Sequence, residues 1–297
     1  MKTFRICIVG GRGRLGAALF RLWNERYHVR ALTREDVDIS DPDALRKRLT
    51  EENFDILVNC AAQASLEYCE DHPEDARAVN TKAPAVMAEV CTEKGVRMMH
   101  VSTDYVFDGL KSDAPYVEED EASPVSIYGW TKLDGEKEVL SAHPLHVVMR
   151  VSWLFGPDKP SFVDILIDRA LKDDSVEAIG DKTSSPTYAD DVALWMEAFF
   201  SSSRKGGLYH ACNSGGCSWR DFAEFAIRQA ADCGAPIKTR DVDFIPMDAM
   251  KSFSALRPLH TVMSTEKLAK EIGIPMRPWQ EAVAAYVRVK FPEKILV

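Results

Sequence analysis

Tyr128 and Lys132 lie four residues apart, a spacing that places two side chains on one face of a helix, about one turn from each other. The apolar run 96–103 predicts a buried strand that ends in Ser102 and Thr103. Ligands of parallel sheets gather at the carboxyl ends of the strands, so a hydroxyl there can meet the tyrosine. We expect Tyr128 to donate a proton to a substrate oxygen, hydrogen-bonded by Thr103, while hydride arrives from a nicotinamide. Lys132 is expected to lower the pKa of Tyr128 and to hold the nicotinamide ribose.

A second tyrosine precedes a lysine by four residues, at Tyr286 and Lys290 near the end of the chain. This spacing is weak evidence by itself. The second pair follows no hydroxyl-ended strand and no cofactor-binding segment, so we interpret it as part of a helix surface.

A glycine-rich turn follows the first apolar run and opens a helical pattern. Its glycines allow a tight turn and a close approach of the backbone to a pyrophosphate, and the helix N-terminus faces the negative charge. The alternative is a turn that only packs a helix on a sheet. The residues of this predicted dinucleotide site are Gly10, Gly11, Arg12, Gly13, Arg14, Leu15 and Gly16.

The second strand ends in Thr33 and Arg34, where an enzyme that uses NAD usually places an acidic residue for the ribose hydroxyls. Arg34, with Arg12 and Arg14 in the glycine turn, suits a 2′-phosphate, so we expect NADPH and leave NADH open. The alternative is that Arg34 is only solvated. Further residues follow strand ends, where they could contact the adenine side or let the backbone run beside the cofactor. These are Asp38, Ile39, Asn59, Ala61 and Ala62.

Strands and helices alternate through the first half of the chain. Apolar runs at 4–9, 29–32, 55–61, 96–103 and 146–153 predict buried strands, and residues 15–26, 42–52, 73–94 and 127–141 show helical spacing. Parallel strands need crossover helices, so this order predicts an α/β fold with a Rossmann-type, doubly wound parallel sheet. Beyond it we expect a helix over 162–172, strands at 176–179 and 207–212, and amphipathic helices in 216–250 and 260–297.

The predicted division into domains follows from the end of the regular alternation of strands and helices after the first half of the chain. We expect a dinucleotide-binding domain over 1–150, to which 183–215 returns. A smaller, interleaved substrate-binding lobe would comprise 151–182 and 216–297.

Composition excludes several classes of protein. The 297 residues include 37 basic and 46 acidic side chains, a net charge of −9, which argues against a nucleic-acid or anionic-membrane surface. The seven cysteines contain no Cys-x-x-Cys pair, so we expect buried free thiols in a reducing compartment. With no apolar signal or membrane-spanning segment, a cytoplasmic location is expected.

Several motifs together resemble the dTDP-4-dehydrorhamnose reductase family of extended short-chain dehydrogenases/reductases, which has an RmlD-like substrate-binding lobe. They are the glycine turn, Ser102–Gly109, Tyr128–Lys132, Arg150–Gly156, Ser185–Tyr188 and Arg257-Pro258. The resemblance implies NADPH-dependent reduction of the 4-keto group of dTDP-4-dehydro-β-L-rhamnose to dTDP-L-rhamnose, for polysaccharide synthesis. It implies a catalytic trio of Thr103, Tyr128 and Lys132, the last two also touching the cofactor. It implies a nucleotide-sugar site formed by Thr103, Asp104, Tyr105, Val106, Phe107, Trp153, Ser161 and Arg257, with Trp153 stacked on base or sugar.

The chain departs from the family pattern where the substrate should lie. Ser161-Phe162 lacks the usual Asn, His260-Thr261 replaces an Asn-Ser pair, and segment 63–70 lacks the usual Thr and Val-Asp. Ala18 stands where some members have a Glu for Mg²⁺, so we expect no metal; a homodimer is left open.

Three other functions share these features. A 4,6-dehydratase would need a Glu after Asp104, where this chain has Tyr105. An epimerase could use the same tyrosine and lysine, on another nucleotide sugar. A non-catalytic NADP binder is also open, because the regulatory subunit of methionine adenosyltransferase resembles these reductases.

Overall fold

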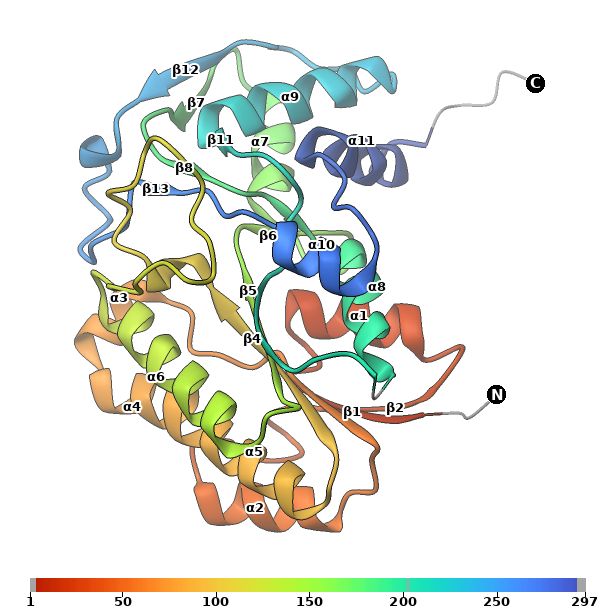
Figure 1. Ribbon diagram of the computed structural model, residues 1–297. Helices are drawn as coiled ribbons and strands as arrows, with labels where there is room; N and C mark the ends of the chain where they lie inside the picture. Colours follow the sequence, from red (N-terminus) through yellow and green to blue (C-terminus); the bar gives the residue numbers. More distant parts are fainter. Residues whose placement is uncertain (1–3, 202, 293–297) are drawn as a thin grey trace.

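A six-stranded parallel sheet forms the centre of the computed structural model, which describes residues 4–201 and 203–292 (Figure 1). Its strand order is β10-β5-β4-β3-β1-β2, with a switch in direction of winding between β1 and β3. The strands are β1 (Arg5–Val9), β2 (His28–Leu32), β3 (Ile56–Asn59), β4 (Arg97–Thr103), β5 (Val147–Val151) and β10 (Gly207–His210). This is the Rossmann-type sheet that the alternation of strands and helices predicts.

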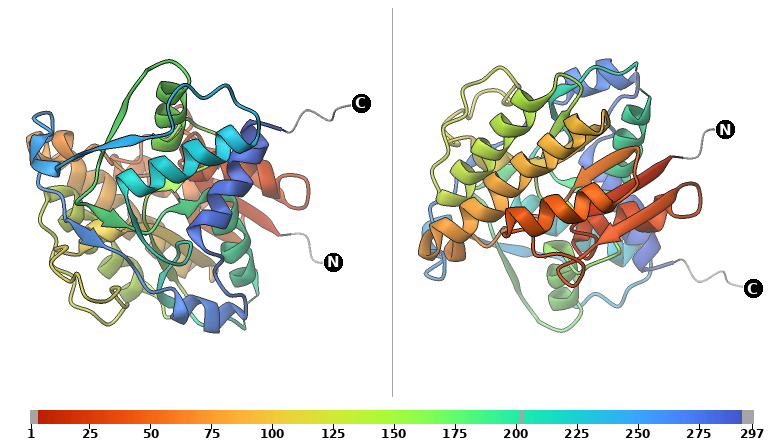
Figure 2. Two further views of the ribbon diagram at one scale, coloured as in Figure 1. Left: turned by 90° about the horizontal axis from the view of Figure 1, so that it is seen from above. Right: turned by 90° about the horizontal axis from the view of Figure 1, so that it is seen from below.

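Helices cover both faces of the sheet. One face packs against α2 (Pro42–Glu51), α5 (Ala83–Glu93) and α6 (Ile127–Ala142), which lie side by side in the right-hand view of Figure 2. The other face packs against α1 (Arg14–Trp23), α8 (Ala189–Glu197) and α10 (Glu266–Ile272). The carboxyl ends of the strands stay uncovered by these helices, and the glycine turn and Thr103 both lie at those ends.

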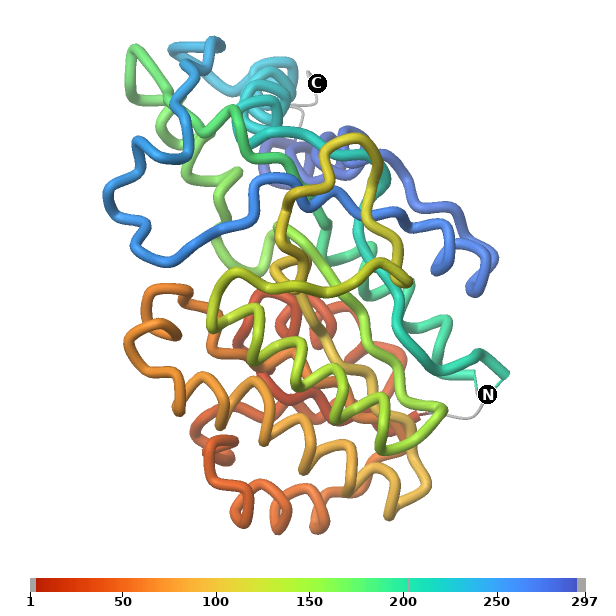
Figure 3. Tube along the Cα trace, turned by 60° about the vertical axis from the view of Figure 1, so that its left-hand side comes forward, coloured from red at the N-terminus to blue at the C-terminus, as the bar shows by residue number. Residues whose placement is uncertain are grey.

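A smaller lobe stands above those strand ends. It contains α7 (Phe162–Ala170), α9 (Trp219–Asp232) and α11 (Trp279–Lys290), packed around an apolar cluster rich in aromatic rings. Its short strands pair as β7 (Val176–Ile179) with β12 (Val242–Ile245), β6 (Leu154–Phe155) with β9 (Thr187–Tyr188), and β8 (Thr183–Ser184) with β11 (Cys217–Ser218) and β13 (His260–Thr261). The loop after β4 joins this lobe, because Tyr116 N–H donates to the Val262 carbonyl at 2.8 Å, and Figure 3 shows the two segments side by side.

Two predicted elements differ from those observed. β2 is only partly buried, because it is an edge strand of the sheet. The single helix expected over 73–94 is instead α4 (Pro73–Arg77), a π-helical turn η1 (Ala78–Lys82) and α5. Pro84 lacks the N–H that a continuous α-helix would use there, which accounts for a change of helical pattern just before it.

Several other expectations are confirmed. The strand near 207–212 is β10, which lies beside β5 in the central sheet. All seven cysteines are free thiols, five of them buried. Within the described part of the chain, no helix is both long and apolar enough to cross a bilayer. The division into two domains stays a prediction, and residues 1–3, 202 and 293–297 of those ranges lie outside the described residues.

Candidate functional site

The glycine turn opens a cavity of about 740 Å³ at the carboxyl ends of β1, β2 and β3. Gly10 adopts a left-handed backbone conformation (φ +85°), and a Cβ there would lie 2.7 Å from the Ala61 nitrogen. A Cβ on Gly16 would overlap the carbonyl oxygen of Gly10, so α1 can start against the turn only with glycine at this position. The turn therefore brings bare backbone to the edge of the cavity, as a bound pyrophosphate requires.

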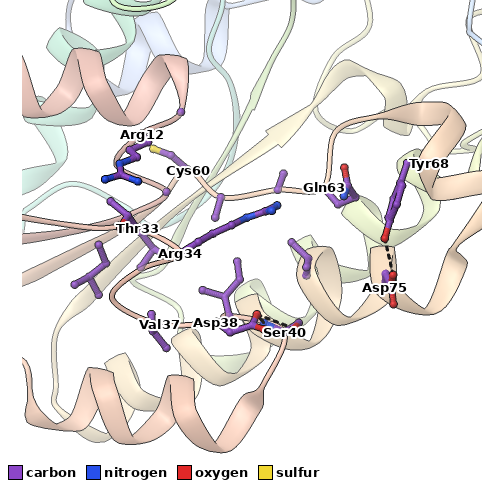
Figure 4. Close-up of a pocket in the computed structure, with 18 of the residues that line it drawn as sticks. Arg12, Thr33, Arg34, Val37, Asp38, Ser40, Cys60, Gln63, Tyr68 and Asp75 are labelled. Atoms are coloured by element: carbon purple, nitrogen blue, oxygen red, sulfur yellow. Dashed lines mark hydrogen bonds between the residues drawn. The ribbon is translucent and has the colours of Figure 1, made fainter.

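The three arginines expected to bind phosphate lie in different environments. Arg34 extends from the end of β2 along the cavity (Figure 4) and forms no hydrogen bond or ion pair with the described residues. Arg12 also lines the cavity, but both its terminal nitrogens pair with Glu35, at 2.5 and 2.8 Å. Arg14 is not placed as predicted for a phosphate-binding residue. Its guanidinium donates to the Pro160 carbonyl at 2.7 Å and so joins α1 to the upper lobe. Arg34 is thus the cation best placed for a cofactor phosphate.

Most of the predicted cofactor residues line this cavity: Gly10, Arg12, Gly13, Arg34, Asp38, Ile39, Ala61 and Ala62. Three others support it from behind, since Gly11 backs onto Ala31 and Leu15 and Gly16 are buried in α1. The other predicted cofactor residues, Arg14, Asn59, Tyr128 and Lys132, do not line it. Sequence reasoning did not assign eleven of the lining residues to the site: Val9, Leu32, Thr33, Val37, Ser40, Cys60, Gln63, Tyr68, Asp75, Val79 and Lys159. Thr33 and Cys60 directly follow strand ends, a signal that could have found them; Asp75, Val79 and Lys159 come from segments that only the fold brings near.

Asn80 holds the segment after β3 in place. This buried residue of η1 accepts from Gln63 N–H at 2.9 Å, and its amide donates to the Gln63 carbonyl and to the Thr131 hydroxyl, at 3.0 and 3.1 Å. The π-helical turn therefore ties the cavity wall to α6, the helix that carries Tyr128 and Lys132.

Thr103 and Tyr128 meet at the end of β4. Ser126 caps α6 by accepting from Gly129 N–H at 3.2 Å, which sets Tyr128 in the first turn of the helix. Burial raises the pKa of Tyr128 to about 12, and a hydrogen bond with Thr103 opposes part of that rise. Burial dominates the pKa of Tyr128, and the expected lowering of this pKa by Lys132 stays a prediction. The phenol is therefore protonated at neutral pH, the state that a proton donor needs.

Lys132 is 1% exposed and lies under Tyr128 in the next turn of α6. Its Nζ donates to the Val101 carbonyl at 2.6 Å and lies 3.2 Å from Nε2 of His100. Burial lowers the pKa of Lys132 to about 8. Sequence reasoning missed His100, although it lies two residues before Ser102 and so on the same face of the same strand.

Asp104 ties the sheet to the upper lobe. One of its carboxylate oxygens accepts from the Ser152 hydroxyl at 2.8 Å and from the Thr261 hydroxyl at 2.5 Å; the other accepts from Thr103 at 3.3 Å. All four side chains are buried. Asp104 thereby accepts the Thr103 hydroxyl proton and, through Ser152 and Thr261, is itself fixed to the upper lobe.

The remaining predicted substrate residues separate into two groups. The side chains of Val106 and Phe107 are fully buried, Phe107 stacking on Tyr116 at 4.0 Å between ring centroids, so any contact of theirs with substrate would use the backbone. Ser161 caps α7 and donates to Asp164 at 2.7 Å, which also commits its hydroxyl to the protein. The side chains of Val106 and Phe107 therefore pack the apolar interior, and the side chain of Ser161 caps a helix.

The second group stays at the interface of sheet and lobe. Tyr105 packs edge-on against Tyr128, with centroids 5.8 Å apart. Arg257 donates to Glu67 at 2.6 Å and lies 3.7 Å above the Phe253 ring. Trp153 has positive φ (48°) and packs among Phe162, Trp219 and Phe222 in the lobe, where it is only partly buried.

The interpretation of Tyr286 and Lys290 as helix surface is wrong. Tyr286 is buried and donates to Asp164, and Lys290 donates to the same carboxylate at 2.7 Å. The pair joins α11 to the start of α7, because the buried carboxylate needs donors. Its role in the structure is therefore to hold the lobe together.

Comparison with known proteins agrees with this geometry. Residues 4–290 match the family model described as the RmlD substrate binding domain. A dTDP-4-dehydrorhamnose reductase of Mycolicibacterium smegmatis is 35% identical, over 94% of this chain and 84% of that protein. A probable dTDP-4,6-dihydroxy-2-methyloxan-3-one 4-ketoreductase of Streptomyces antibioticus is 33% identical, over 97% and 95%. The crystal structure of dTDP-4-dehydrorhamnose reductase from Bacillus anthracis in complex with NADP superposes with a TM-score of 0.87 at 26% identity, covering 96% of this chain and 98% of that one.

Proposed function

The chain belongs to the RmlD substrate binding domain family, and from this membership we propose that it reduces the 4-keto group of a dTDP-linked deoxy sugar with NADPH. The substrate we propose is dTDP-4-dehydro-L-rhamnose, and the product dTDP-L-rhamnose. The observation that carries the proposal is the convergence of Thr103, Tyr128 and buried Lys132 at the end of β4, the strand next to β3, whose carboxyl end lines the cofactor cavity. Sequence-based expectations of a cytoplasmic location and of a homodimer stay predictions.

The residues of the cavity fit NADPH. Bare backbone at Gly10 and Gly13 suits the pyrophosphate, and Arg34 has a guanidinium that no residue of 4–201 and 203–292 pairs with, which leaves it for the 2′-phosphate. When bound, NADPH supplies the hydride that adds to the carbonyl carbon.

The proton comes from the protein. Tyr128 holds its proton at neutral pH because burial raises its pKa, and we assign it as the donor to the carbonyl oxygen. Thr103 would turn its single hydroxyl proton from Asp104 to that oxygen and donate a hydrogen bond to it as negative charge develops. The protonated form of Lys132 would stabilise the phenolate that remains. The carbonyl becomes a hydroxyl, and Tyr128 regains a proton from solvent.

The sugar nucleotide would lie between the sheet and the lobe, against Tyr105, Trp153 and Arg257. Arg257 can meet an anionic group, and Trp153 offers an aromatic face for a base or sugar. Because Val106, Phe107 and Ser161 are committed to packing and capping, we omit their side chains from the proposed site.

The experiment is to mix the purified protein with NADPH and dTDP-4-dehydro-L-rhamnose and to follow the absorbance of NADPH, with product identified by mass and NMR. Loss of NADPH with formation of dTDP-L-rhamnose is the expected result. The 33% identical 4-ketoreductase favours a second candidate, another dTDP-linked ketone, which the same assay tests. Binding of NADPH without reduction of any such ketone would contradict the proposal and favour a non-catalytic NADP binder.

A further inference from the structure

Asn59 has one amide orientation that satisfies its neighbours. Its Oδ1 accepts from the Ala61 N–H at 3.0 Å, and its Nδ2 lies 3.0 Å from Nδ1 of His100. The reversed amide would point N–H groups at the N–H of Ala61, leaving two donors face to face. Asn59 and His100 are 1% and 0% exposed, so no solvent can relieve that conflict. The Asn59 amide therefore donates to His100.

This orientation selects the tautomer of His100. An Nδ1 that accepts a hydrogen bond carries no proton, so the neutral imidazole carries it on Nε2. Burial lowers the pKa of His100 well below its usual range, with the charge of Lys132 as a second cause, so the ring is neutral. The Nε2–H then points at the Nζ of Lys132, 3.2 Å away.

An ammonium group has donors only, so a charged Lys132 and an Nε2–H cannot form a hydrogen bond. A neutral amine has a lone pair that can accept from Nε2–H while one of its own protons goes to the Val101 carbonyl. We propose that His100 is a positioning residue that sets the charge state of Lys132: held by Asn59, it donates to the lysine and favours the neutral amine. The proposal rests on the proposed role of Lys132.

The other groups that face Lys132 do not replace this control. Glu136 is on the following turn of α6 and favours the charged lysine, but it already forms two bonds to Arg150, at 2.9 and 2.7 Å. Cys60, after β3, is a weaker influence in the same direction, and its own thiol is kept protonated by burial. Burial lowers the pKa of Lys132, as the bond from His100 does. Because this pKa is about 8, close to neutral pH, one hydrogen bond from His100 can decide whether the amine is charged.

Protonation of Lys132 then requires a coordinated change. The proton of His100 must move from Nε2 to Nδ1, and the Asn59 amide must reverse, which breaks its bond to Ala61 N–H. Ala61 lines the cofactor cavity. The charge of the lysine is thus coupled through His100 and Asn59 to the backbone of the cofactor site.

The test is ¹⁵N NMR of the full-length protein labelled at histidine nitrogens, with the His100 signals assigned by their absence in His100→Gln. Above the pKa of Lys132, about 8, where the amine is neutral, we expect an unprotonated Nδ1 and a protonated Nε2. His146 is an internal control, because backbone groups hold it in the same tautomer: Nδ1 accepts from Met98 N–H and Nε2 faces the Ala88 carbonyl. A wild-type His100 that stays protonated on Nδ1 above that pH would overturn the proposal without any activity measurement.

The variant Asn59→Asp reverses the preference, since a carboxylate accepts from both Ala61 N–H and Nδ1–H. We expect a proton on Nδ1 of His100 and an unchanged His146 spectrum. We also expect the apparent pKa above which activity is lost to rise by about one pH unit. The sign follows because Lys132 is protonated below its pKa, and an accepting Nε2 stabilises that form. An unchanged His100 spectrum in folded Asn59→Asp would overturn the proposal. Failure of the proposed reductase function would remove the kinetic shift but leave the tautomer result intact.

Discussion

Two tyrosines precede lysines by four residues in this chain, and their surroundings give them different roles. Tyr128 is at a strand end beside Thr103, whereas Tyr286 satisfies a buried carboxylate in the lobe. The four-residue spacing therefore does not tell the two tyrosines apart. Their roles differ because their hydroxyl groups face different partners.

Tyr128→Phe removes the proposed proton donor and little else. We expect kcat to fall by roughly 10²- to 10⁴-fold, the usual contribution of general acid catalysis, with the Kd of NADPH nearly unchanged. Stopped-flow turnover and fluorescence titration of NADPH measure the two quantities. Tyr286→Phe is the matched control, and we expect it to lower the unfolding free energy by about 1.5–3 kcal/mol while the folded protein retains turnover. Full activity in Tyr128→Phe would exclude this tyrosine from the mechanism.

Arg34→Ala tests whether this arginine binds the 2′-phosphate. A charged hydrogen bond contributes about 1.5–3 kcal/mol, so we expect NADPH to bind roughly 10- to 100-fold more weakly and NADH to change little. Arg12→Ala is the control, because Arg12 is already paired with Glu35 and is expected to matter less. Equal losses for both cofactors in Arg34→Ala would assign the arginine another role.

At the scale of elements, the glycine turn depends on how closely α1 approaches the end of β1. Four glycines within seven residues predict such a turn, and the structure shows that Gly16 matters through its contact with Gly10. The π-helical turn η1 is a second such element: Pro84 interrupts the α-helical pattern, and Asn80 reaches the cavity wall from this turn. Sequence periodicity alone could not place Asn80, because a π-turn rotates the residues after it out of the α-helical register.

Gly16→Ala is predicted to displace α1 from the turn. The added methyl would overlap the Gly10 carbonyl, so we expect a loss of about 1–3 kcal/mol in unfolding free energy together with weaker NADPH binding. Denaturant unfolding and cofactor titration measure both effects. Gly156→Ala is the control, since its Cβ would come no closer than 3.2 Å to any neighbour, the Ala189 methyl, and so avoids the overlap with backbone found at Gly16. Wild-type cofactor affinity in Gly16→Ala would show that the turn tolerates a wider opening.

At the scale of the whole molecule, the site depends on the upper lobe being seated on the sheet. Asp104 from the sheet binds Ser152 and Thr261, and Tyr116 in the loop after β4 pairs with the segment around Val262. The proposed catalytic threonine therefore depends on residues more than a hundred positions away.

Thr261→Val removes one donor from Asp104 without changing the shape of the side chain. We expect a loss of about 1.5–3 kcal/mol in unfolding free energy and a higher KM for the sugar nucleotide, with NADPH affinity retained. Thr50→Val is the control, because the Thr50 hydroxyl bonds only to the Arg46 carbonyl on an exposed helix. Weakened NADPH binding in Thr261→Val would mean that the tie supports the cofactor site as well.

The amino-acid sequence by itself determined the Rossmann-type sheet and the glycine turn, and it predicted the trio of Thr103, Tyr128 and Lys132, because these depend on local spacing and on the ends of apolar runs. Only the tertiary structure decided which arginine is free for a phosphate, that Tyr286 serves Asp164, and that Asn59 and His100 reach Lys132. Hydrogen-bond partners from distant segments settle such questions, since a buried polar group takes its role from the donors and acceptors around it. Local spacing cannot specify those partners, and folding brings them together.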